Sequence, residues 1–195
     1  VAGRDVVASL SIGVALAGEY ADDVDGLLKC ADAAMRAAKL AGGSRHRAYE
    51  PQMEADHRQR LDLDLRLRRA LERGEFFLVY QPIVDAEGHG IVAVEALLRW
   101  ADPERGVISP ADFIPLLEQS GLIVPVGRWT MHEACRRGRA WIDKGAEDLV
   151  MSVNVSPRQF AEPDFVQTVA AVLAETGLPR GHLQLEVTEG LLLEP

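Results

Sequence analysis

From residue 91 onward, short apolar runs alternate with amphipathic segments that have helical spacing. The runs at 91–100, 149–156 and 182–190 have the length of strands, and helix-prone segments separate them. A strand–helix–strand order is typical of an α/β fold with a parallel sheet, and short buried strands suit a barrel. A complete (β/α)8 barrel takes ~250 residues, and only about half of that length follows residue 60. The sequence therefore predicts an incomplete (β/α)8 TIM-like barrel.

A further strand is predicted at 76–85, just before the run at 91–100. The turn "AEGHG" separates the two runs, so we expect them to pair as an antiparallel hairpin. After the hairpin, Ser109 followed by Pro110 predicts the start of a helix, because proline is favoured at the first helical position.

The first 50 residues have a different pattern. A strand is predicted at 6–16, a helix at 24–41 and a short strand at 44–51. Asp22 or Asp23 is suited to cap the helix. A charged, helix-prone segment then leads into the barrel. We expect three parts along the chain: part of an α+β domain at 1–50, a linker at 51–60 and the incomplete barrel at 61–195.

The composition excludes several classes of protein. The chain is 48% hydrophobic and 26% charged, which suits a globular fold, and its net charge of -9 disfavours general binding of nucleic-acid polymers. Cys30 and Cys135 lie far apart, which indicates reduced thiols in a cytoplasmic protein. No apolar run is long enough to span a membrane. Both ends fall beside strand-like runs, so we expect a fragment of a longer protein, which an upstream region could tether to a membrane.

Three predicted strands each carry a polar residue late in an apolar run: Glu95, Asn154 and Glu186. In barrels the reacting groups sit at the C-terminal ends of the strands, so we expect these three side chains to converge. Two carboxylates and an amide oxygen suit Mg²⁺ or Mn²⁺. The five histidines lie outside these strand ends, which disfavours zinc.

Each of the three residues also has a simpler interpretation. Glu95 could form an ion pair with Arg99 or another arginine, Asn154 could bond backbone groups, and Glu186 could lie in a solvated strand exit. For any one residue the simpler interpretation is favoured, because polar residues are common at strand ends. Their recurrence on successive strands favours a metal site.

The same residues lie within longer motifs: "FFLVYQPIVD" at 76–85, "EALLRW" at 95–100, "SPADFIPLLEQSGLI" at 109–123, "SVNVSPRQF" at 152–160 and "LQLEVTEG" at 183–190. In this order they resemble the EAL family of cyclic di-GMP phosphodiesterases, from about residue 61 to the end. The segment from residue 6 to about 49 resembles, more weakly, the C-terminal part of a GGDEF (diguanylate cyclase) domain. The resemblance thus implies the first half of an EAL domain after the last part of a GGDEF domain.

The resemblance implies roles for particular residues. Glu95, Asn154 and Glu186 would be metal ligands in a site for two Mg²⁺ or Mn²⁺ ions, and Glu95 would take part in catalysis. Glu189 resembles the residue that braces a catalytic loop. The implied reaction is metal-assisted hydrolysis of cyclic di-GMP to linear pGpG.

Two further residues resemble positions that contact the ligand. Gln81 is one of them, although hydrogen bonding at its own strand end is an equally good interpretation. Arg99 would lie near a phosphate, where a charge-assisted hydrogen bond gives a physical reason for its presence. The family also implies a homodimer formed through the EAL domain.

Departures from the family pattern limit these expectations. The later acidic pair, lysine and last glutamate of the family would fall beyond residue 195, so we expect this fragment alone to lack hydrolase activity. A domain that binds cyclic di-GMP as a sensor without hydrolysis, or a dimerising scaffold, stays as an alternative.

In the first part of the chain, Lys39 matches the GGDEF family, but Gly43 stands where the family has an arginine and Arg36 where a tyrosine is common. These changes put GTP binding by that domain in doubt.

Overall fold

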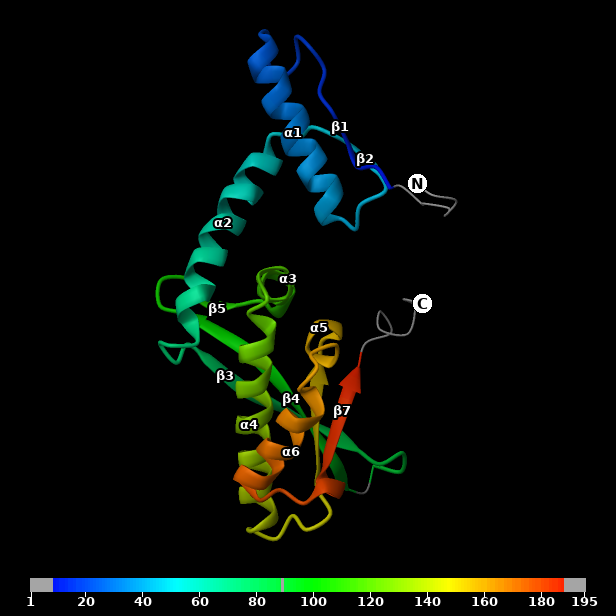
Figure 1. Ribbon diagram of the computed structural model, residues 1–195, viewed down its shortest axis with the longest axis vertical. Helices are drawn as coiled ribbons and strands as arrows, with labels where there is room; N and C mark the ends of the chain where they lie inside the picture. Colours follow the sequence, from blue (N-terminus) through cyan, green and yellow to red (C-terminus); the bar gives the residue numbers. More distant parts are fainter. Residues whose placement is uncertain (1–8, 89, 188–195) are drawn as a thin grey trace. The chain divides into compact units, whose positions relative to one another are not determined.

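The computed structural model describes residues 9–88 and 90–187 (Figure 1). The chain divides into two compact units, Val1–Leu63 and Asp64–Pro195. Helix α2, Gln52–Ala70, runs without a break through the position of this division. None of the helices in the described ranges has both the length and the apolarity needed to cross a bilayer.

The first unit is built around a strand–helix–strand motif. Strands β1 (Ile12–Val14) and β2 (His46–Ala48) pair in parallel, and helix α1 (Val24–Leu40) connects them. The strands predicted at 6–16 and 44–51 are observed over three residues each, which pair with one another. Residues 1–8 lie outside the described part.

Helix α1 has the ends that its sequence predicts. The Asp23 carboxylate accepts a hydrogen bond of 2.6 Å from the Gly26 N–H, which satisfies a donor that the helix itself leaves unpaired. After the helix, Gly42 has a φ of 103°, which is unfavourable for other residues. Gly13 in β1 permits the close approach of α1, since a Cβ there would lie 1.9 Å from the Ala31 carbonyl oxygen.

The second unit contains the predicted sheet. Its strands are β3 (Phe76–Val84), β4 (Ile91–Asp102), β5 (Gly106–Ile108), β6 (Val150–Val155) and β7 (Leu183–Val187). They follow the order β3-β4-β6-β7, with β5 paired to β4. The antiparallel pairing of β3 with β4 is confirmed, as is the parallel arrangement of β4, β6 and β7.

The helices of this unit follow the strands in the predicted alternation. They are α3 (Pro110–Ser120), α4 (Ile123–Ile142), α5 (Pro157–Phe160) and α6 (Phe165–Thr176), and a 3-10 turn, Arg180–His182, leads into β7. Ser109 occupies the N-cap of α3 as expected, but its side chain forms no capping hydrogen bond.

Helices α4 and α6 cover one face of the sheet (Figure 1). The buried side chains between these layers come from β4, α4, β6, α6 and the turn after α6: Ala96, Met131, Ala134, Cys135, Met151, Val153, Val172 and Leu178. Burial raises the pKa of the Cys135 thiol to about 12, so it is an apolar core group at neutral pH. Because side chains alternate along a strand, the neighbours of Ala96, Met151 and Val153 face the opposite side of the sheet.

Candidate functional site

A row of polar residues crosses four strands on the face opposite the helices. In the strand register, Gln81 of β3 lies opposite Glu95 of β4. Glu95 in turn lies opposite Ser152 of β6, and Asn154 of β6 lies opposite Glu186 of β7. The structure therefore brings four of the predicted site residues onto adjacent strands. Glu189 lies outside the described residues.

Two short hydrogen bonds join this row from strand to strand. The Asn154 Nδ2 donates to Glu95 Oε1 at 2.6 Å. The Ser152 hydroxyl donates to Glu186 Oε1 at 2.5 Å. Strand β6 thus supplies one donor to the carboxylate on each neighbouring strand, and charge-assisted bonds of this kind are the stronger class.

Arg99 does not neutralise Glu95. No ion pair joins the two side chains in the described part of the chain, and Arg99 Nη1 donates to the Leu98 carbonyl oxygen at 2.9 Å. The simpler interpretation, in which Arg99 is the structural partner of Glu95, is therefore wrong. The partner of Glu95 is the amide of Asn154.

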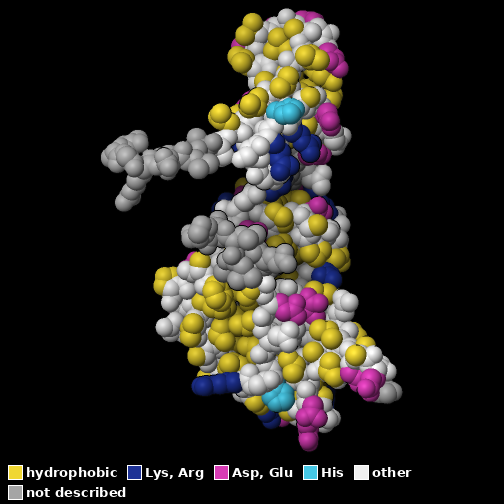
Figure 2. Space-filling model, turned by 90° about the vertical axis from the view of Figure 1, so that its right-hand side faces the viewer, with side chains coloured by type: hydrophobic (Ala, Val, Ile, Leu, Met, Phe, Trp, Pro, Cys, Tyr) yellow, Lys and Arg dark blue, Asp and Glu magenta, His cyan; other side chains and the backbone are white. Residues whose placement is uncertain are grey.

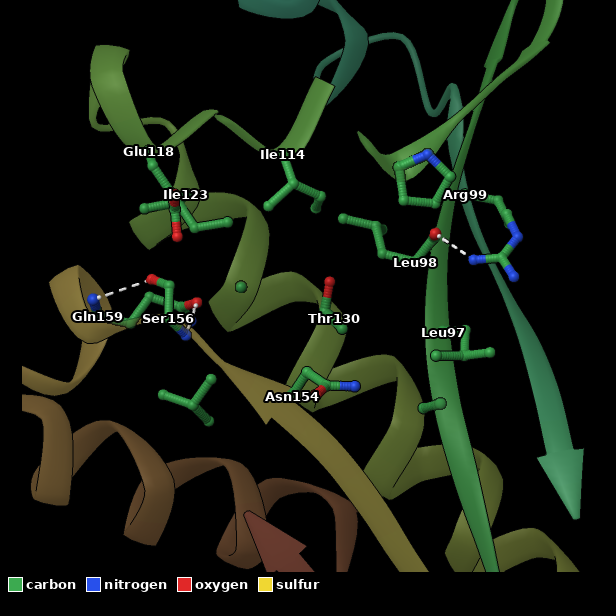
Figure 3. Close-up of a pocket in the computed structure, with 14 residues that line it drawn as sticks. Leu97, Leu98, Arg99, Ile114, Glu118, Ile123, Thr130, Asn154, Ser156 and Gln159 are labelled. Atoms are coloured by element: carbon green, nitrogen blue, oxygen red, sulfur yellow. Dashed lines mark hydrogen bonds between the residues drawn. The ribbon is translucent and has the colours of Figure 1, made fainter. Parts of the chain in front are cut away.

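A cavity of about 290 Å³ lies where β4 and β6 separate, beyond their last paired residues, Ala96 and Val153. Arg99 and Asn154 line it from the sheet, and residues of α3, α4 and α5 complete its wall (Figure 3). The hydroxyl of Thr130 on α4 borders the cavity, is buried and has no hydrogen-bond partner among the described residues. Arg99 and Asn154 thus both contribute to the wall of this cavity, although the Arg99 guanidinium is directed away from it (Figure 3).

The side-chain oxygen atoms of this row are suited to bind a hard divalent cation. Each hydrogen bond from β6 engages Oε1 of its carboxylate, so the second oxygen of Glu95 and of Glu186 stays available, as does Oδ1 of Asn154. Such oxygen ligands are those that Mg²⁺ and Mn²⁺ prefer. Within residues 9–88 and 90–187, no three His, Cys, Asp or Glu side chains cluster as a metal site. The described residues thus offer two carboxylates and one amide.

Ser152 is a residue of this row to which the sequence analysis assigned no role. The signal was the two-residue period, which aligns Ser152 with Asn154 and points it toward the neighbouring strands. The two-residue period does not predict the register of β6 against β7. That register sets Asn154 opposite Glu186 and brings the Glu186 side chain within reach of the Ser152 hydroxyl.

A comparison with known protein families identifies the family of the second unit. Residues 64–194 match the EAL domain, which is more than half of the chain. The chain therefore belongs to the EAL domain family.

Particular relatives share much of the sequence. The bifunctional diguanylate cyclase/cyclic di-GMP phosphodiesterase MucR of Pseudomonas aeruginosa is 43% identical over 186 residues, which are 95% of this chain and 27% of that protein. The cyclic di-GMP phosphodiesterase PdeR of Escherichia coli is 38% identical over 190 residues, 97% of this chain and 28% of that protein. The chain spans about a quarter of the length of such curated relatives.

Solved structures share the fold. The structure described as the PaMucR phosphodiesterase in complex with c-di-GMP is 45% identical, with a TM-score of 0.66. The similarity covers 68% of this chain and 54% of that one.

Proposed function

We propose that the protein containing this chain hydrolyses cyclic di-GMP to linear pGpG by metal-assisted attack of water on a phosphodiester. The observation that carries the proposal is the row of Glu95, Asn154 and Glu186 on the adjacent strands β4, β6 and β7. Within it Asn154 donates to Glu95, and Ser152 of the same strand donates to Glu186. Further support comes from relatives named as cyclic di-GMP phosphodiesterases and from a similar structure described as a c-di-GMP complex.

The described residues would divide the work between two tasks. Glu95, Asn154 and Glu186 would hold Mg²⁺ or Mn²⁺, whose chemistry when bound is to activate water and to stabilise the attacking and leaving oxygens. Arg99 would bind a phosphate through charge-assisted hydrogen bonds, and Gln81 would contact the ligand beside Glu95. The Asn154 amide would fix the Glu95 carboxylate in one orientation.

The 195-residue chain alone is proposed to be inactive, because the resemblance implies that the family's remaining acidic pair and lysine would fall beyond residue 195. Half of a metal site cannot stabilise both oxygens of an in-line displacement. Activity is therefore proposed for the full-length protein. The homodimer that the family resemblance implies is proposed for the same full-length protein.

We propose separately that residues 1–50 are the C-terminal part of a GGDEF domain. The parallel β1–α1–β2 motif agrees with an α+β domain. The match to MucR, whose name includes a diguanylate cyclase, extends over 95% of this chain and so includes most of the first unit. The departures at Arg36 and Gly43 argue for a degenerate domain, and Arg36 forms an ion pair with Asp32 inside α1.

The direct test is turnover of cyclic di-GMP by the full-length protein. We expect linear pGpG to form with Mg²⁺ or Mn²⁺, and its formation to stop when a chelator removes the metal. Chromatography of the products measures both. Binding of cyclic di-GMP without any linear product would favour the sensor, and neither binding nor product would refute both assignments.

A further inference from the structure

Ser152 occupies the centre of the polar row and is completely buried, with 0% of its surface exposed. In the register it lies between Glu95 on one side and Gln184 on the other. Its hydroxyl does not cap a helix or bond a backbone group in the described part of the chain; it donates to Glu186 Oε1 at 2.5 Å.

A buried hydroxyl is costly unless it forms a hydrogen bond, and alanine would fill the same space without that cost. The apolar neighbours of Ser152 on β6, Met151 and Val153, belong to the core on the other face. Packing therefore does not require a serine at this position. The bond to the carboxylate gives the hydroxyl its physical role.

The two donors of β6 act in the same way on the two sides of the strand. Asn154 Nδ2 holds Oε1 of Glu95, and Ser152 Oγ holds Oε1 of Glu186. A hydrogen bond that fixes one carboxylate oxygen removes most of the rotational freedom of the group. The direction in which the second oxygen points is then fixed as well. Hydrogen bonds of this kind orient metal ligands and tune their affinity.

We infer that Ser152 is a positioning residue for the divalent-metal site, which orients Glu186 so that its second oxygen serves as the ligand. The inference rests on the proposed function, because it assumes that Glu186 binds metal. A serine with a purely structural role would affect the stability of the sheet and leave the affinity for metal unchanged.

The experiment is a titration of the full-length protein with Mn²⁺, without substrate, followed by the loss of the free-ion signal in electron paramagnetic resonance. We expect Ser152→Ala to weaken Mn²⁺ binding by about tenfold, the lower end of the range for residues that support metal ligands. Ser152→Cys keeps a hydrogen-bond donor in a somewhat larger side chain, and the thiol is the weaker donor, so we expect an intermediate affinity. Circular dichroism reports whether each variant is folded.

Ser120→Ala is the matched control. The Ser120 hydroxyl donates to the Leu116 carbonyl within α3, so its removal deletes the same atom from a partly buried site without touching a carboxylate. We expect this variant to bind Mn²⁺ as the wild type does. In turnover assays, Ser152→Ala should raise the Mn²⁺ concentration for half-activation and recover most of its rate at saturating Mn²⁺.

The outcomes separate the two proposals. Wild-type protein that binds no Mn²⁺ would refute the metal site itself. If the wild type binds Mn²⁺ and folded Ser152→Ala binds it equally well, the positioning role is overturned while the proposed function stands.

Discussion

Arg99 lies on the same face of β4 as Glu95, yet its guanidinium donates to a backbone carbonyl and not to that carboxylate. Sequence alone allowed both interpretations, because a two-residue period places the two side chains on one face without saying which groups touch. The structure decides in favour of Asn154 as the partner of Glu95. Arg99 contributes to the wall of the cavity beside β4, with its guanidinium held on the other side of the strand by the Leu98 carbonyl (Figure 3).

Replacing Arg99 with alanine should weaken the binding of cyclic di-GMP by roughly tenfold or more, since hydrogen bonds to charged groups contribute about 1.5–3 kcal/mol. The effect should be largest on KM, because the guanidinium is proposed to contact a phosphate that is charged before and during the reaction. Steady-state kinetics of the full-length protein measure this. Arg180→Ala, in the exposed turn before β7, is the control and should leave KM unchanged. An unchanged KM in Arg99→Ala would remove Arg99 from the ligand site.

At the scale of elements, the strands of the sheet could be predicted because apolar runs and their two-residue period are local properties. The pairing of β3 with β4 followed from the turn between them. Helix α5 was missed, although "SPRQ" at 156–159 carries its signal. Ser156 and Gln159 form a capping box, with Pro157 in the first turn.

What could not be predicted depends on contacts between distant segments. The Ser152–Glu186 bond joins residues 34 positions apart and needs the register of β6 against β7. The cavity beside Arg99 needs the separation of β4 from β6 and the packing of three helices around it. Neither is encoded in a local pattern.

The turn from β4 to β5 depends on one buried carboxylate. Asp102 is 3% exposed, accepts hydrogen bonds from the backbone N–H groups of Glu104 and Arg105, and forms an ion pair with Arg66. Burial raises the pKa of the Asp102 carboxyl, but these hydrogen bonds and the guanidinium outweigh it and hold the pKa below its usual range.

Asp102→Asn should lower the free energy of unfolding by about 2 kcal/mol at neutral pH, because buried donors lose a charged acceptor. A lowered pKa in the folded state means that the stabilisation is present above ~pH 4 and is lost as the pH falls through the folded pKa. The variant should therefore lose less stability than the wild type on acidification. Urea unfolding at neutral and acid pH measures both effects.

Glu104→Gln is the control for Asp102, because the Glu104 side chain pairs with the same Arg66 but is 72% exposed. Exposed ion pairs contribute ~0–1 kcal/mol, so its effect should be small. If the stability of Asp102→Asn and of the wild type depends on pH in the same way, protonation of Asp102 does not cause the predicted loss of stability at acid pH.

At the scale of the molecule, the sheet of the second unit is open along the described strands, with β3 and β7 at its ends. Apolar side chains gather on the visible face of this unit (Figure 2). Exposed apolar residues include Val84, Ile91 and Val92, at 56%, 58% and 45%. Exposed apolar patches are typical of surfaces that another segment or another copy covers. This agrees with the expectation of an incomplete barrel and with the proposal that activity belongs to the full-length protein.

Glu95, its hydrogen-bond partner Asn154 and the nearby Glu186 are proposed to form the first part of the metal site. The measurement is the turnover of cyclic di-GMP by the full-length protein with Glu95→Gln, beside Glu147→Gln as control. Glu147 is exposed and lies before β6, at the opposite end of that strand from Asn154. We expect Glu95→Gln to abolish formation of pGpG, because glutamine has lost the charge that binds the cation, and Glu147→Gln to retain the wild-type rate. Wild-type turnover by Glu95→Gln would show that Glu95 is not a metal ligand.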